Sequence, residues 1–67
     1  MRVTILEKKR REHAWTKAEL ARRAKMQGST IGWIEEGRFK PYDSQLKKLA
    51  EQLEVADPHK LLDISEA

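Results

Sequence analysis

The segment from Trp15 to Leu20 contains the clearest helix start in the chain, and it limits where the neighbouring elements can lie. Thr16 is followed three residues later by Glu19, the spacing of a capping box in which each side chain accepts from the other residue's backbone N–H. Trp15 and Leu20 stand at the positions of a hydrophobic staple. We therefore expect a helix over residues 16–25. Its inward-facing side chains would be Leu20, Ala21 and Ala24.

The next stretch, QGSTIGWIE, has a helical pattern but contains two glycines, each of which costs a helix interior about 1 kcal/mol relative to alanine. We expect this helix to begin at Gln27 and to end before Gly37, which suits a left-handed helix stop. A period of 3.6 residues places Ile31 and Ile34 on the buried side. The opposite face would then carry Ser29, Gly32 and Trp33, a combination unusual for plain solvent exposure.

Three further helices complete the prediction. The first should run from about Thr4 to His13. The fourth should be capped by Asp43 or Ser44, and its apolar residues recur at helical spacing, namely Leu46, Leu49, Ala50 and Leu53. A short fifth helix should open at Asp57–Pro58, because Asp caps helices and Pro is favoured at the first helical position. Strand patterns are absent, so we predict one compact, all-α, five-helix domain over residues 1–67.

Composition restricts the class of protein. The chain has 67 residues and no cysteine, which fits a small helical core in a reducing cytoplasm. It contains neither a signal-peptide pattern nor an apolar run of the ~20 residues that a membrane span needs. We therefore expect a soluble, cytoplasmic protein without a membrane role.

Charge is unevenly distributed along the chain. Residues 1–40 hold eleven Lys and Arg against five Glu, whereas residues 41–67 hold three Lys against six acidic residues. A basic half suggests a surface that faces a polyanion. Ordinary solvated helix faces would give the same counts, so charge alone leaves both interpretations open.

Two short helices joined by a tight turn make a helix-turn-helix, and here the chain resembles a known family. The run TKAELARRAKMQGSTIGWIEEGRFKP, residues 16–41, is similar to the Xre-type domain of phage repressors, Cro proteins and many bacterial regulators. The helix-turn-helix itself would span about residues 16–37. The positions that match without a gap are Thr16, Leu20, Ala21, Met26, Ser29, Thr30, Ile31, Ile34, Glu35, Gly37 and Pro41.

The resemblance implies a phage-repressor-like fold and a sequence-specific, repressor-like transcriptional regulator that places its third helix in the major groove of double-stranded DNA. It implies no cofactor and no metal. The candidates for reading bases are Gln27, Gly28, Ser29, Gly32 and Trp33. The candidates for holding phosphates are Lys17, Thr30, Arg38 and Lys40. Arg10 and Glu35 match a structural ion pair of the family.

Three of these assignments have alternatives. Thr30 could bond a phosphate or cap its own backbone. The glycines would allow close approach to the groove, but Gly32 could equally make room for a neighbouring side chain. Trp33 could contact DNA, anchor another protein or fold over its own domain.

Three departures from the family pattern concern helix stops. Where the family usually has Gly, this chain has Ala14, Lys25 and Glu54. If these residues keep a positive φ, each carries strain of about 1 kcal/mol; otherwise the turns differ. Gln27 also replaces the usual Ser or Thr cap of the third helix.

Partner and enzyme assignments complete the expectations. His13 and His59 are isolated and no metal-binding or nucleophile motif is present, so we expect no enzyme activity. The resemblance implies a homodimer on palindromic half-sites, with an apolar dimer surface near the acidic C-terminal end, formed by Val55, Leu61, Leu62 and Ile64. The alternative function is an antitoxin or phage accessory protein that acts mainly through a protein partner.

Overall fold

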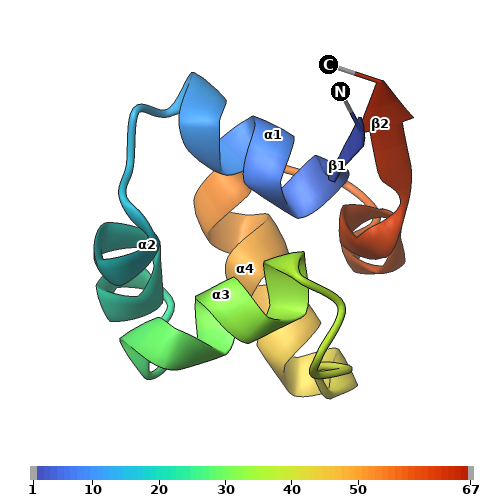
Figure 1. The fold of residues 1–67 in the computed structure, drawn as a ribbon. Helices are drawn as coiled ribbons and strands as arrows, with labels where there is room; N and C mark the ends of the chain where they lie inside the picture. Colours follow the sequence, from blue (N-terminus) through green and yellow to red (C-terminus); the bar gives the residue numbers. More distant parts are fainter. Residues whose placement is uncertain (1, 67) are drawn as a thin grey trace.

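A computed structural model describes residues 2–66, which form a small helical bundle whose two ends lie side by side (Figure 1). In chain order the elements are β1 (Arg2–Thr4), α1 (Ile5–Glu12), α2 (Lys17–Arg23), α3 (Gly28–Glu35), α4 (Asp43–Leu53), the 3-10 helix η1 (Pro58–Leu62) and β2 (Ile64–Glu66).

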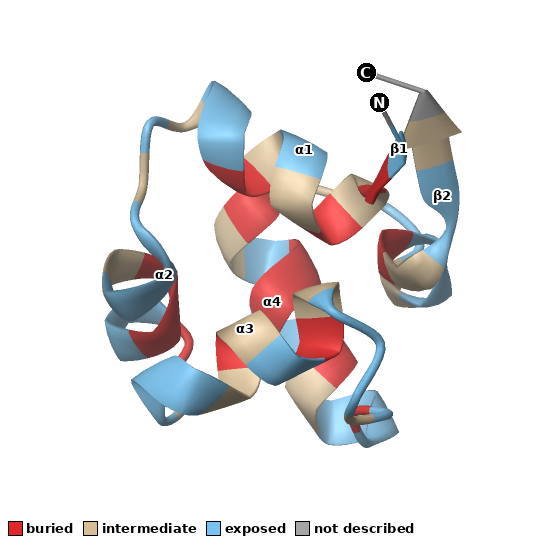
Figure 2. Cartoon of the chain, viewed as in Figure 1, coloured by how far each residue is buried: buried red, intermediate tan, exposed pale blue. Residues whose placement is uncertain are grey.

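The hydrophobic core lies around α4, which is central in Figure 1. Its four periodic apolar side chains are all buried (Figure 2). Leu6 of α1, Leu20 of α2, and Ile31 and Ile34 of α3 pack into the same cluster, together with Leu61 of η1. The predicted inner faces of the second, third and fourth helices are confirmed by this burial.

The helix start at Thr16 is confirmed in one half of its predicted capping box. The hydroxyl of Thr16 accepts from the backbone N–H of Glu19 at 3.0 Å. The carboxylate of Glu19, however, is engaged by Arg22 at 2.7 Å and by Arg23 at 2.8 Å. The Glu19 carboxylate lies one turn before the two arginines, so it binds these charged donors and not the backbone N–H of Thr16.

The turn between α2 and α3 shows how a non-glycine residue can end a helix. Lys25 has φ +57°, and the N–H of Met26 then returns to the carbonyl of Ala21 at 2.7 Å. Ala14 and Glu54 also have positive φ, at 59° each, and Gly37 has φ +78°. Of the two alternatives, the positive φ at all three stops is therefore confirmed.

Two features of the predicted fold are wrong. The fifth helix is a 3-10 helix, so the described residues contain four α-helices. The chain also has strands, because β1 and β2 pair antiparallel with Thr4 opposite Ile64. Three-residue strands are too short to show alternation, and their pairing joins the two ends of the chain. Ile64, expected in the last helix, therefore lies in β2.

Two predicted helix starts need smaller corrections. The first helix begins at Ile5, with Thr4 as its cap accepting from the N–H of Glu7 at 3.1 Å. The fourth is capped at Tyr42, before Asp43, because the amide oxygen of Gln45 accepts from the Tyr42 N–H at 2.9 Å.

The expected ion pair between Arg10 and Glu35 is present and nearly buried, with side-chain exposures of 10% and 2%. It is bidentate: Nε donates to Oε2 at 2.7 Å and Nη2 donates to Oε1 at 3.1 Å. The remaining Nη1 donates to the carbonyl of Trp15 at 2.9 Å. One guanidinium thus ties α1 to the last residue of α3 and to the turn before α2.

The strained stops give a stability prediction. Replacing Ala14, Lys25 or Glu54 by glycine should raise the free energy of unfolding by about 0.5–1 kcal/mol each, because relief of left-handed strain exceeds the added entropy of the unfolded chain. Urea denaturation of the three single variants measures the effect. Ala18→Gly, inside α2, is the matched control and should destabilise. Loss of stability at all three stops would contradict the argument.

The buried ion pair gives a second prediction. Glu35→Ala should lower the free energy of unfolding by about 3–5 kcal/mol, because Arg10 would keep a buried charge without its partner. Arg10→Met combined with Glu35→Leu should recover most of that loss, since no unpaired charge remains. Lys9→Met, which breaks an exposed pair with Glu12, should change stability little. A double variant no more stable than Glu35→Ala would refute this explanation.

Candidate nucleic-acid interface

The outward face of α3 is the most distinctive surface of the molecule. The buried Ile31 and Ile34 hold the helix from behind, which leaves Gln27, Gly28 and Ser29 exposed at its start. The ring of Trp33 is 48% exposed one turn further on. Figure 2 shows this exposed strip along the front of α3. The predicted base-reading residues are therefore together on one accessible surface, apart from the half-buried Gly32.

The two glycines of α3 lie one turn apart, and both face the start of α2. A Cβ at position 28 would stand 3.9 Å from the Cα of Ala18, and a Cβ at position 32 would stand 3.8 Å from Cδ and Nζ of Lys17. These are ordinary van der Waals distances. The packing of the chain therefore leaves room for alanine at both positions and does not itself require glycine.

The start of α3 is weakly held. Gln27 is the cap residue, and its side chain makes no capping hydrogen bond. Its amide group is therefore not used to hold the helix start. Thr30, half-buried in the first turn, donates its backbone N–H to the Gln27 carbonyl at 3.1 Å.

The predicted phosphate contacts surround this face. Lys17 begins α2, and Arg38 and Lys40 lie in the loop after α3; all three are exposed. Arg38 is partly neutralised by Glu36, with Nε and Oε2 3.4 Å apart, a feature that charge counting missed. Both side chains are more than half exposed, so this pair is weak and yields readily to a phosphate.

The arginines of α2 are less available than their sequence positions suggest. The two hydrogen bonds from Arg22, at 2.7 Å each, lower the pKa of the Glu19 carboxyl below its ordinary value of 4.5. The same contact raises the pKa of Arg22. Because the folded-state pKa of Glu19 is depressed, this stabilisation is present above about pH 4.5 and is lost as the pH falls. At neutral pH, Glu19 offsets positive charge on this helix.

Trp15, expected in the core, is half-buried and packs against it. Its ring stacks on His13 with centroids 4.4 Å apart, and the guanidinium carbon of Arg23 lies 4.4 Å from its centroid. These contacts fix the turn between α1 and α2. Trp15 is thus a structural residue beside the interface.

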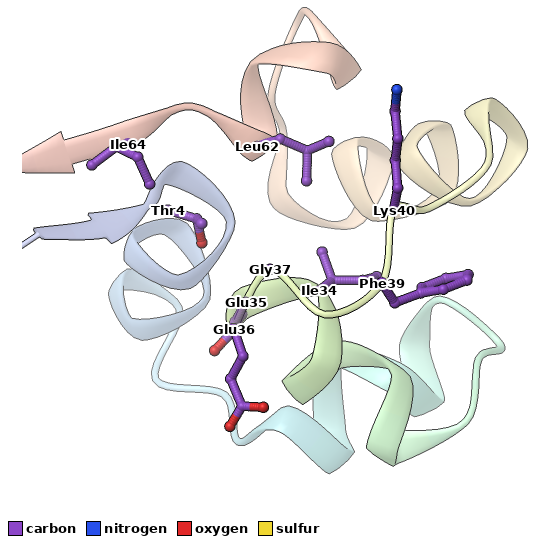
Figure 3. A pocket seen from close by; sticks show the side chains of 9 residues that line it. All are labelled: Thr4, Ile34, Glu35, Glu36, Gly37, Phe39, Lys40, Leu62 and Ile64. Atoms are coloured by element: carbon purple, nitrogen blue, oxygen red, sulfur yellow. The ribbon is translucent and has the colours of Figure 1, made fainter.

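The predicted dimer surface is only partly formed. Leu61 is 0% exposed and belongs to the domain's own core, so its assignment is wrong. Val55 is half-buried against that core. Leu62 and Ile64 instead line an open hollow of about 300 Å³, together with Ile34 and Phe39 (Figure 3). The leucine pair of η1 is divided because 3-10 geometry turns neighbouring side chains to different sides.

Within residues 2–66, no group of three or more His, Cys, Asp or Glu side chains is placed to hold a metal ion. No helix in this described part of the chain is long and apolar enough to cross a membrane.

The arrangement of α2, a tight turn and an outward-facing α3 defines a DNA-binding domain of the helix-turn-helix class. A family model described as a helix-turn-helix domain matches residues 6–62, and the chain belongs to this family. This match agrees with the Xre/Cro-type resemblance of the sequence. No curated protein and no solved structure matches the chain significantly.

Proposed function

We propose that this protein is a sequence-specific, repressor-like transcriptional regulator that binds double-stranded DNA with α3 in the major groove. The observation that carries the proposal is the pair of glycines on α3. Gly32 lies in the helix interior, where glycine costs stability relative to alanine, whereas Gly28 is the first residue of α3. The neighbouring α2 would accept alanine at both positions. A close approach from outside the chain gives a reason for the missing side chains, because a helix without Cβ atoms can lie nearer to base edges.

The surrounding side chains suit direct readout. An amide such as Gln27 can bind adenine through two hydrogen bonds, and a hydroxyl such as Ser29 pairs less selectively. Trp33 offers its exposed half to a thymine methyl or a sugar. Together these residues supply donors, acceptors and apolar area along one helix face.

Groups on either side of α3 would position the domain on the duplex. Thr30, Arg38 and Lys40 are the phosphate contacts we propose, and the exposed ammonium of Lys17 is a further cation at the same surface. Such contacts give affinity without sequence information. Each neutralised phosphate releases counterions, so binding should weaken steeply with salt.

A symmetric dimer would extend the recognised site to two half-sites about one DNA turn apart. Leu62 and Ile64 at the apolar hollow are the contacts we propose, since Ile64 is 53% exposed on β2. Both lie near the C-terminal end of the described chain, and the hollow they line also includes Glu36 and Lys40 from the end of α3 and the loop after it.

A second function is favoured by the exposure of Trp33, because large half-exposed aromatic rings are common anchors of protein interfaces. In that case the protein would be an antitoxin or phage accessory protein that acts mainly through a protein partner. The double variant Ser29→Ala, Trp33→Ala separates the two functions. If these residues read bases, the variant should have a relaxed DNA sequence preference. If they bind a protein partner, the variant should keep its DNA sequence preference and lose the partner.

The first test is selection from a random-sequence duplex library over a salt series, followed by sequencing of the retained DNA. We expect affinity to fall steeply with salt and a palindromic sequence to be enriched. Salt-sensitive retention without enrichment would indicate non-specific DNA binding. No retention at low salt would reject DNA binding and favour the protein-partner function.

The glycine argument gives a further prediction with opposite signs in two assays. Gly32→Ala should raise the free energy of unfolding by about 0.5–1 kcal/mol, because its Cβ would make only ordinary van der Waals contact with Lys17. The same variant should bind the selected duplex more weakly, because the methyl group separates α3 from the groove. Urea denaturation and fluorescence anisotropy measure the two effects. Gln52→Ala on α4 is the control, and equal DNA binding by all three proteins would reject a close approach at position 32.

A further inference from the structure

Lys17 belongs to α2, but its side chain lies across α3. Cδ and Nζ are both 3.8 Å from the place where a Cβ of residue 32 would stand. Both atoms are within ordinary van der Waals range of that position. The ammonium group therefore lies beside Gly32 and does not extend away from α3.

This ammonium brings a positive charge that α3 lacks. Residues 28–35 contain neither lysine nor arginine. Arg22, Arg23 and Arg38 are each paired with a nearby carboxylate, whereas within residues 2–66 no carboxylate is recorded within 4.0 Å of Lys17 Nζ. The charge of Lys17 is therefore available to a ligand on the outward face of α3.

The position of Gly32 on that face decides which ligand atoms the charge can meet. Gly32, Trp33 and Glu36 follow Ser29 by three, four and seven residues, so the four positions form one stripe along the helix. Gly32 is the gap in the stripe, and the end of Lys17 lies beside it. In a major-groove complex this stripe faces base edges, while phosphates lie along the groove walls.

We propose that Lys17 is a specificity-determining residue that donates to the O6 and N7 atoms of a guanine through the gap at Gly32. This assignment rests on the proposed function and replaces the expected phosphate contact of Lys17. Lysine and arginine pair with these guanine acceptors more often than with other base atoms. Gly32 then has a second role, because any side chain longer than alanine would displace the lysine.

The test compares Lys17→Met with Lys40→Met in the random-library selection; both substitutions remove one exposed charge and keep a long aliphatic side chain. Lys17→Met should abolish the guanine preference at one position of each half-site, where discrimination should fall about 5- to 100-fold. The other positions should stay unchanged. Lys40→Met should weaken binding to all sequences and reduce the salt slope by about one phosphate contact.

Gly32→Met provides the second variant, because it displaces Lys17 without removing its charge. Gly32→Met should lose the guanine preference at the same position of the half-site. Adding Lys17→Met should not change the preference at that position any further. Thermal melts establish whether each variant is folded.

The outcomes separate this inference from the proposed function. Suppose that the wild-type protein enriches a sequence, and that Lys17→Met keeps the base preference at every position of it and lowers only the salt dependence of binding. Lys17 is then a phosphate contact. The inference is then overturned and the proposed function stands. If the wild-type protein enriches no sequence, both the proposed function and the role of Lys17 are rejected.

Discussion

The orientation of α3 depends on the ion pair between Arg10 and Glu35. A buried charge is tolerated only when its hydrogen-bonding groups are well satisfied, and here one guanidinium serves a carboxylate at the end of α3 and the carbonyl of Trp15. Planar, bidentate geometry fixes direction as well as distance. The pair therefore favours one angle between α3 and the rest of the bundle. Apolar packing alone would define that angle less specifically.

Because α3 is held by this pair and by the buried Ile31 and Ile34, its outward residues carry little of the fold's stability. The cap residue Gln27 leaves its side chain out of capping, and Trp33 remains half exposed. The cations beside it differ in availability: Arg22 and Arg23 are occupied by Glu19, whereas Lys17 lies over Gly32. The buried face of α3 therefore stabilises the fold, and its exposed face is available for the proposed contact with DNA.

Local signals predicted most of this fold. The Thr16 cap, the periodic leucines of α4 and the stop at Gly37 depend on residues within one or two turns, and each is where the sequence places it. The ion pair could be expected only through resemblance, because its partners are 25 residues apart.

The wrong predictions share a cause. The pairing of β1 with β2 and the end of the last helix depend on contacts between the two ends of the chain. The burial of Leu61 depends on the packing of η1 against α4 and α1; all of these contacts join separate elements of the fold. Nothing in a three-residue strand indicates its partner. Within the candidate site, the lysine over Gly32 joins α2 to α3 through side-chain geometry, which periodicity cannot supply.

Glycine is absent from three helix stops that favour it and present in a helix that it weakens. At the helix stops Ala14, Lys25 and Glu54, φ is positive and glycine would relieve strain, yet the chain has other residues there. In α3 the chain has glycine at the first residue and again at Gly32 in the interior, where it weakens the helix, and the neighbouring elements require neither. Nothing in the structure explains the residues at the three stops. The glycines of α3 are different, because Gly32 lies beside the end of Lys17 and the proposed approach of α3 to a DNA groove would give both of them a role. A helix built for stability would carry alanine at these positions, so the surface they create is the part of this fold best explained by binding.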